Sequence, residues 1–477
     1  MQEFSSRFKR FFAPRDMTVG KPITELIMFS IPLLLGNFAQ QMYNTVDAIV
    51  VGNYVGDNAL GAVGLSNAVL NLMLSLFMGI ATGAGIIVSQ YFGAKDRAAL
   101  SRSVGTIIVL TFWAGLITMV IGVLASRPLL VLIGTPTDML DMTATYLEVI
   151  FAGIIGCAYY NILSGVLRGL GDSFSPLIYL LLATVINIVL DIVFVTAFHM
   201  TTDGVALATI IAQGVSAIFC YRRLTRMIDV LDVNRHTLKI DKAIASRTVK
   251  LGLPSGLTQA IFSLQAVIVQ SLMNSFGPMV VTTFTAVMRV DGFAMMPNFT
   301  FGIAATTFSG QNYGARRLDR VKEGSRDAIK LAIICSTFLT VCILLFGRQL
   351  MAVFTQTEAV VNLGVRMMRI LALGYIAFSV TQTLSGIMRG LNETVIPMWI
   401  SLITTFAIRM PLAYAMAYAT HSAEWPNGDP SSLYWSLLIA WVAGGLITSL
   451  VYHKGKWRKR AEAGLIDPPA VPDVSTP

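Results

Sequence analysis

The sequence predicts an all-α integral membrane protein of twelve transmembrane helices, arranged as two parallel six-helix repeats. Three observations predict this fold class. First, 55% of the 477 residues are hydrophobic and only 13% are charged, whereas soluble domains carry about 25% charged residues. Second, apolar runs long enough to span a bilayer recur along the whole chain. Third, two short motifs recur at one fixed spacing.

The apolar runs define the predicted spans. Each is about 20 residues or longer, which is the length that a transmembrane helix requires. The predicted spans are 23–51, 59–91, 103–125, 143–167, 174–198, 204–221, 250–275, 280–312, 327–346, 364–388, 395–419 and 433–452.

Basic residues gather in alternate connections. The two tails and the connections after the second, sixth and eighth spans are rich in Lys and Arg, whereas 52–58, 199–203, 276–279 and 420–432 contain none. Positive loops stay on the cytoplasmic side, so both termini are predicted to be cytoplasmic and the number of spans to be even. The net charge of +9 comes from these basic connections and tails. It therefore does not indicate a nucleic-acid partner, and we expect none.

A duplication organises the chain. "LSGVLRGLGDSFSP" (163–176) shares seven of fourteen residues with "LSGIMRGLNETVIP" (384–397), 221 residues later. "QYFGAK" (90–95) and "QNYGAR" (311–316) have the same spacing. Because six is even, both halves enter the membrane in the same direction, and secondary transporters with such repeats place the substrate site between the halves. The predicted parts are a cytoplasmic tail 1–22, an N-lobe 23–221, a basic linker 222–249, a C-lobe 250–453 and a cytoplasmic tail 454–477.

Polar side chains lie inside several spans of the predicted N-lobe. Asn37, Gln40, Gln41, Asn44 and Asp47 occupy one arc of roughly 120° on the first span. Asn187 and Asp191 are one turn apart on the fifth span, and Thr209 lies near the start of the sixth. In the predicted topology Asp47, Asn187, Asp191 and Thr209 all fall in the outer half of the lobe.

These four side chains offer hard oxygen ligands for a small cation such as Na⁺. Burial also favours the protonated form of a carboxyl group, so the same group could hold a proton. The alternative is a structural polar network between helices. Intramembrane carboxylates are functional by default, so we predict ion or proton coupling.

The predicted C-lobe has a different polar pattern. The seventh span carries Ser255, Gln259, Ser263, Gln270 and Asn274 on one face, without an acid. Asp291 is the central acid, and its neighbour Arg289 points elsewhere because residues at i and i+2 do not share a helix face. We therefore predict a structural ion pair between Asp291 and Arg409. We also expect a substrate cavity lined by Gln40, Tyr43, Asn44, Gln259, Ser263 and Gln270.

Enzymatic chemistry has little support in the sequence. The four histidines lie at span ends or in loops, and the four cysteines lie in or beside apolar runs without metal-ligand spacing. No nucleophile motif remains for catalysis. We expect no enzyme activity and no cofactor beyond a coupling ion, H⁺ or Na⁺.

The two six-span halves carry three motifs, "QQMYNTVDAIVVG" (40–52), "SGVLRGLGD" and "SGIMRGLNE". Through these halves and motifs, the chain resembles the multidrug and toxic compound extrusion (MATE) family over about residues 20–455. The resemblance implies two lobes in a V that exchange drugs or metabolites, often organic cations, for Na⁺ or H⁺. It implies an N-lobe coupling site at Asp47, Asn187, Asp191 and Thr209. Some members also have acidic residues in the seventh and tenth spans, but this chain has none there.

The predicted function is a cation- or proton-coupled antiporter that works by alternating access of its lobes. We expect a monomer in the bilayer of a bacterial inner membrane, acting on small molecules. The alternative is a flippase for a lipid-linked precursor in a related branch. Such a protein would place several cations in its central cavity, and only Arg289 and Arg409 are candidates here.

Overall fold

The structure, a computed structural model, describes residues 14–55, 57–132, 135–422, 425–455 and 463. Helices make up nearly all of this part, and none of it is strand. The helices are α2 (Pro22–Val50), η1 (Val51–Val55), α3 (Asp57–Gly93), α4 (Arg97–Leu132), α5 (Thr137–Ala152), α6 (Ile154–Gly169), α7 (Phe174–Thr196), α8 (Thr202–Thr225), α9 (Lys242–Ser275), α10 (Pro278–Gly314), α11 (Leu318–Ala352), α12 (Glu358–Gly390), α13 (Val395–Leu402), η2 (Ile403–Arg409), α14 (Met410–Ala419) and α15 (Ser432–Lys454).

The predicted number of spans is confirmed. Within the described residues, 11 helices are long and apolar enough to cross a membrane, and the bent pair α5 and α6 makes 12 when it is counted as one span. Some helix ends lie close to the predicted span ends, for example Phe174–Thr196 against 174–198, whereas α4 (Arg97–Leu132) and α11 (Leu318–Ala352) extend several residues beyond theirs. The first span continues as helix through Pro32.

Besides the π-helix η1 that follows α2, two spans depart from regular α-helix in ways that periodicity did not predict. The fourth span bends by 54° between α5 and α6, and at the bend a Cβ on Gly153 would lie 2.5 Å from the Cβ of Ile210. The eleventh span contains the π-helix η2, with Pro411 at the start of α14. Proline has no N–H to donate, so a regular helix would lose a hydrogen bond at this point.

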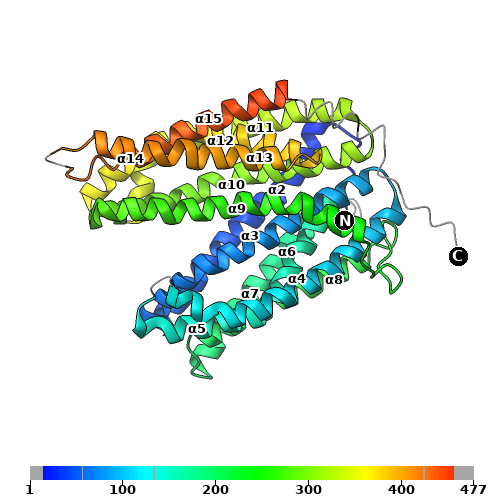
Figure 1. The fold of residues 1–477 in the computed structure, drawn as a ribbon, viewed down its shortest axis with the longest axis horizontal. Coiled ribbons are helices and arrows are strands. Elements are labelled where there is room, and N and C mark those ends of the chain that lie inside the picture. Colours follow the sequence, from blue (N-terminus) through cyan, green and yellow to red (C-terminus); the bar gives the residue numbers. More distant parts are fainter. Residues whose placement is uncertain (1–13, 56, 133–134, 423–424, 456–462, 464–477) are drawn as a thin grey trace, which may run out of the picture. The chain divides into compact units, whose positions relative to one another are not determined.

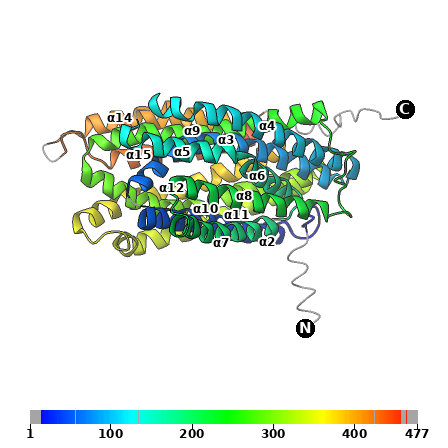
Figure 2. The same ribbon diagram turned by 90° about the horizontal axis from the view of Figure 1, so that it is seen from below.

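The chain divides into two compact units (Figure 1). The first unit comprises Met1–Asp16 and Ile27–Ser263, and the second comprises Met17–Leu26 and Leu264–Pro477. The division between the two units therefore lies inside α9. Figure 2 shows the same helices from a second direction.

Close helix crossings explain the duplicated glycine motif. In the first unit α3 packs against α6. A Cβ on Gly165 would lie 2.6 Å from the carbonyl oxygen of Ala81, and one on Gly169 would lie 2.7 Å from that of Gly85. Glycines four residues apart let two helix backbones approach each other closely. The motif "SGVLRG" is thus one side of a backbone-to-backbone contact.

The second unit repeats this crossing between α10 and α12. A Cβ on Gly386 would overlap the carbonyl oxygen of Gly302, and one on Gly390 would lie 2.5 Å from that of Thr306. The spacing between equivalent glycines is again 221 residues. The predicted duplication therefore has a matching packing core in each unit.

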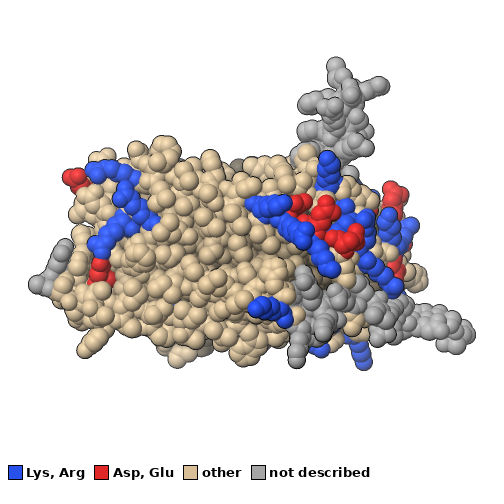
Figure 3. All heavy atoms as spheres, turned by 90° about the horizontal axis from the view of Figure 1, so that it is seen from above, with Lys and Arg blue, Asp and Glu red and all other residues tan. Residues whose placement is uncertain are grey.

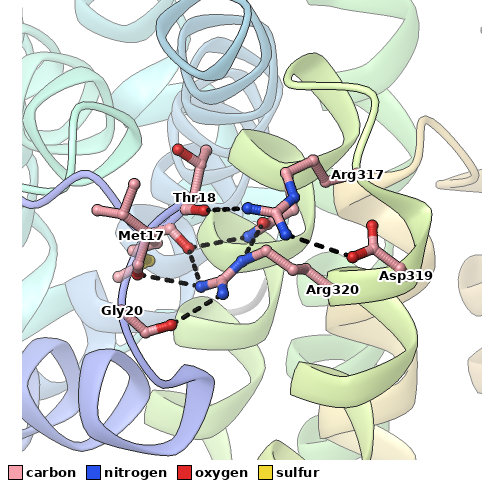
Figure 4. Close-up of polar contacts among 8 residues, drawn as sticks. Met17, Thr18, Gly20, Arg317, Asp319 and Arg320 are labelled. Atoms are coloured by element: carbon pink, nitrogen blue, oxygen red, sulfur yellow. Dashed lines mark hydrogen bonds and ion pairs between the residues drawn. The ribbon is translucent and has the colours of Figure 1, made fainter.

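A short segment before α2 belongs to the second unit because it is bound there by hydrogen bonds (Figure 4). The backbone N–H of Met17 donates to Gln311 Oε1 at 2.8 Å. Arg320 donates to the carbonyl oxygens of Gly20 at 2.8 Å, Val19 at 3.0 Å and Met17 at 3.1 Å. Met17 is fully buried. The start of the first span is thereby anchored on the α10–α11 turn.

The segment before α9 is anchored in the same manner on the first unit. Thr106 of α4 donates to the Lys239 carbonyl and accepts from the Asp241 N–H, both at 3.1 Å. Arg247 donates to Gln90 Oε1 at 2.6 Å. Gln90 and Gln311 open the two copies of the shorter repeated motif. Each copy therefore holds the segment that leads into the first span of the other repeat.

Candidate functional site

Three of the four predicted coupling residues lie on α7 and α8, which pack against each other. Asn187 and Asp191 are both 0% exposed, and they lie one turn apart on α7. Asn187 Nδ2 donates to Thr209 Oγ1 at 3.5 Å, which is at the long limit of a hydrogen bond. The pairing follows from the close packing of α7 on α8.

The helix that carries Asp47 runs beside the same stretch of α7. Ala39 of α2 packs with Leu177 and Leu180, and Val51 of η1 shares an apolar cluster with Val195 near the other end of α7. The backbone between Ala39 and Val51 is therefore level with the stretch of α7 that contains Asn187 and Asp191. The side chains of the predicted site residues Asn44 and Asp47 lie outside the described part of the structure.

The chemistry of this region is that of hard oxygen donors. Asn187 Oδ1 is buried and accepts no hydrogen bond from the described residues. A buried amide oxygen without a donor is unfavourable by about 1–3 kcal/mol, and a bound cation or a proton carrier would relieve this cost. A carboxylate one turn away supplies the negative charge that either ligand requires. We call Asn187, Asp191 and Thr209 the α7–α8 polar group.

The predicted substrate-cavity residues lie on two helices. On α2, Gln40 is half-buried and Tyr43 is buried. On α9, Ser263 donates to the Gln259 carbonyl at 3.3 Å, and both residues belong to the first unit. Gln270 belongs to the second unit, where it donates to Asn274 Oδ1 at 2.8 Å. Their shared role in a cavity stays a prediction.

A second buried polar cluster lies within the second unit. Asp291 of α10 is 9% exposed and accepts a hydrogen bond from Tyr375 Oη of α12 at 2.7 Å. Arg409 of η2 is near enough to attract this carboxylate. Within the described residues, however, Asp291 forms no ion pair with Arg409, and its hydrogen bond comes from Tyr375. Sequence reasoning missed Tyr375 because a tyrosine in an apolar span resembles ordinary packing.

Two further groups in this cluster are incompletely satisfied. Arg409 Nε and Tyr434 Oη are buried and form no hydrogen bond with the described residues. Arg409 also ends the π-helix η2, and π-helical turns occur frequently at functional sites. The second unit thus holds a carboxylate and a guanidinium that share one buried region without a direct contact.

Known proteins share the duplicated architecture of this chain. The MatE family model matches residues 32–193 and again residues 254–415, which confirms the duplication. The probable multidrug resistance protein YpnP of Bacillus subtilis is 30% identical over 397 residues, covering 83% of this chain and 88% of that protein. The probable multidrug resistance protein YoeA of the same organism is 28% identical over 449 residues, covering 92% and 95%.

Solved structures agree with the fold. A crystal structure of MATE in complex with MaL6 has a TM-score of 0.85 at 23% identity and covers 94% of this chain and 98% of that one. A MOP superfamily transporter from Pyrococcus furiosus has a TM-score of 0.84 at 23% identity, with the same coverage. At these identities the likeness concerns the fold alone. The twofold family match and the relatives show that this multi-span chain belongs to the MatE family of membrane transporters and is a transporter, not an enzyme.

Proposed function

We propose that this transporter is a cation- or proton-coupled antiporter that exports drugs or metabolites, organic cations and amphiphiles among them, by alternating access. The family assignment supports export of small molecules, because YpnP and YoeA are both named probable multidrug resistance proteins. Coupling to an ion gradient is the finer part of the proposal. It rests on the buried polar side chains of the first unit.

One observation carries the coupling proposal. Asp191 is fully buried one turn from Asn187, which contacts Thr209 on the neighbouring helix. Ionisable side chains inside membrane spans mark ion or proton pathways by default. We propose that Asp47, Asn187, Asp191 and Thr209 together bind H⁺ or Na⁺, with Asp47 supplied by the neighbouring stretch of α2.

Binding at this group would be linked to substrate affinity. A bound ion that changes the affinity for substrate must have its own affinity changed by the same factor. The ion then need not touch the substrate. It must only favour one packing of α2 against α7 over another.

Transport in proteoliposomes tests the proposal. Full-length protein is reconstituted, and efflux of a fluorescent organic cation is measured with a pH gradient and a Na⁺ gradient imposed separately. One gradient should drive efflux, and Asp191→Asn or Asp47→Asn should reduce the driven rate by about 10- to 100-fold, within the usual range of coupling energies. Asp141→Asn is the matched control, because the Asp141 side chain is 78% exposed.

The outcomes are distinct. Gradient-driven efflux at the normal rate in Asp191→Asn and Asp47→Asn would overturn the assignment of the coupling group. Efflux that ignores both gradients would overturn antiport itself. Headgroup-dependent translocation of a lipid-linked precursor would favour the flippase alternative.

The membrane arrangement is also proposed. We place the chain in the bacterial plasma membrane as a monomer. Both termini are proposed to be cytoplasmic, because Lys and Arg gather in every second connection between the spans. Reporter fusions after residue 455 and within 420–432 should report opposite sides of the membrane. Reporters on the same side would contradict the topology.

A further inference from the structure

A basic pocket lies in the second unit, at the end of α11 and the start of α12. Its volume is 640 Å³, and its lining residues are Arg348, Asn362, Val365, Arg366, Arg369, Ile370 and Trp435. Because α12 packs against both α11 and α15, the pocket is a groove over α12 with one neighbouring helix on each side. Figure 3 shows basic side chains gathered at one end of this face, apart from the larger basic group at the other end.

The charges in the groove are only partly compensated. Arg348 pairs with Glu358 at 3.2 Å and donates to Asn362 Oδ1 at 3.3 Å. Arg366 pairs with Asp429. Arg369 lines the same pocket, and its guanidinium has no ion pair or hydrogen bond within the described part of the chain. Three arginines therefore face two carboxylates, and one full positive charge remains.

Exposed apolar side chains continue the groove along each of its three helices. Leu373, one turn after Arg369 on α12, is 55% exposed. Leu345 precedes Arg348 by one turn on α11, and Ile439 follows Trp435 by one turn on α15; both are also exposed. Residues three or four apart share a helix face, so this apolar strip lies one helical turn from the polar residues of the groove, on the same helix faces.

This arrangement matches an amphiphile with an anionic head. Arginine forms bidentate, charge-assisted hydrogen bonds with phosphate oxygens, and basic pockets between transmembrane helices on the cytoplasmic side bind anionic headgroups through the same chemistry. Tryptophan favours the membrane–water interface, where a headgroup lies. A free phosphate would use the arginines but not the strip, whereas a phospholipid uses both.

We propose that this groove binds an anionic phospholipid. Arg369, with Arg348 and Arg366, holds the phosphate, and an acyl chain lies along Leu373 between α11 and α15. The proposal is independent of ion coupling. In the topology proposed above, the groove faces the outer leaflet, because it lies at the opposite end of α11 from the basic α10–α11 turn.

The first repeat offers a matched comparison. At the spacing of 221 residues, Arg348 corresponds to Arg127, Asn362 to Asp141 and Arg369 to Glu148. Leu130 and Met351 also correspond at this spacing, and both are fully buried, which supports the alignment of the two repeats. Arg127 is neutralised by Asp141 at 2.9 Å, and an acid replaces the unpaired arginine. The groove chemistry is therefore specific to the second repeat.

The test measures lipid retention by purified full-length protein. The protein is delipidated in a neutral detergent, and phosphatidylglycerol, phosphatidylcholine with the same acyl chains, or glycerol phosphate is added before native mass spectrometry. Wild type should retain phosphatidylglycerol in preference to phosphatidylcholine and should not retain glycerol phosphate. Arg369→Gln should weaken this retention about fivefold, as the usual contribution of one basic residue implies, and Leu373→Asn should weaken it too.

Arg127→Gln is the control, because it removes the corresponding arginine from the first repeat. It should retain phosphatidylglycerol as wild type does. Equal retention of the two phospholipids, unchanged retention in Arg369→Gln, or an equal loss in Arg127→Gln would overturn the proposal. Retention of glycerol phosphate with unchanged lipid binding in Leu373→Asn would identify a phosphate site and not a lipid site. Arg369 has no partner among the described residues to lose, so its replacement should leave the fold intact.

Discussion

The fourth span of the first repeat bends by 54° at Gly153, whereas its counterpart α12 continues unbroken through the equivalent Gly374. In the fifth span of each repeat, it is the second repeat that is irregular. In the first repeat it is the regular helix α7, and in the second it contains the π-helix η2. Each repeat therefore departs from regular helix at a different place.

The polar side chains differ along with the helices. The regular helix α7 carries Asn187 and Asp191, whereas η2 ends in Arg409, which shares its region with Asp291 and Tyr375. By contrast, the glycine crossings of α3 on α6 and of α10 on α12 are the same in both. Duplication has thus preserved the contacts that hold each repeat together, while the buried charges have diverged.

The largest effect should come from filling the shared crossings. Gly165→Leu and Gly386→Leu would each drive a side chain into a backbone carbonyl, of Ala81 and Gly302 respectively. Overpacking costs about 1–3 kcal/mol in adaptable cores and more where the obstacle is backbone. We expect neither variant to accumulate as a monodisperse protein in size-exclusion chromatography. Gly214→Leu is the control, because a Cβ there meets nothing within 4 Å; damage from only one crossing variant would show that the repeats are not equivalent.

The next effect should separate the two anchored segments. Arg320 is 6% exposed and binds several carbonyl oxygens of residues 17–20, so Arg320→Gln should lower the free energy of unfolding by on the order of 3 kcal/mol. The chain that leads to the segment before α9 is also held by Arg97, which binds Asp232 and the Ile228 carbonyl and has a side chain that is 51% exposed. Arg97→Gln should therefore cost less than about 1 kcal/mol. Thermal unfolding measures the stability of both variants, and limited proteolysis should release the N-terminal segment only in Arg320→Gln. Equal losses of stability in the two variants would mean that the two anchors contribute equally.

Much of the fold follows from the sequence because lipid imposes length and polarity on each span. Apolar runs place the helix ends within a few residues for spans such as 174–198, where α7 ends at Thr196. The duplicated motif predicts the repeat. Neither the bend nor the π-helix was predictable, because Gly153 and Gly374 stand in similar apolar runs and only the packing partner of each differs.

The candidate site is predictable to a similar depth. Helical spacing placed Asn187 and Asp191 on one face, and the structure adds the hydrogen bond from Asn187 to Thr209 on α8. The partner of Asp291 could not be read in the same way, because a pairing between helices depends on their relative rotation. Charge alone favoured Arg409, whereas the hydrogen bond comes from Tyr375.

The smallest effects should distinguish the two buried polar groups by their hydrogen bonds. Tyr375 donates to Asp291 at 2.7 Å, whereas Asn187 donates to Thr209 at 3.5 Å. Tyr375→Phe leaves a buried carboxylate without its donor and should cost about 1.5–3 kcal/mol, as for hydrogen bonds to charged groups. Thr209→Val removes a long neutral bond and should cost less than about 1 kcal/mol. Thermal unfolding in one detergent compares them, and a larger loss in Thr209→Val would show that the first repeat, and not the second, depends on its polar group for stability.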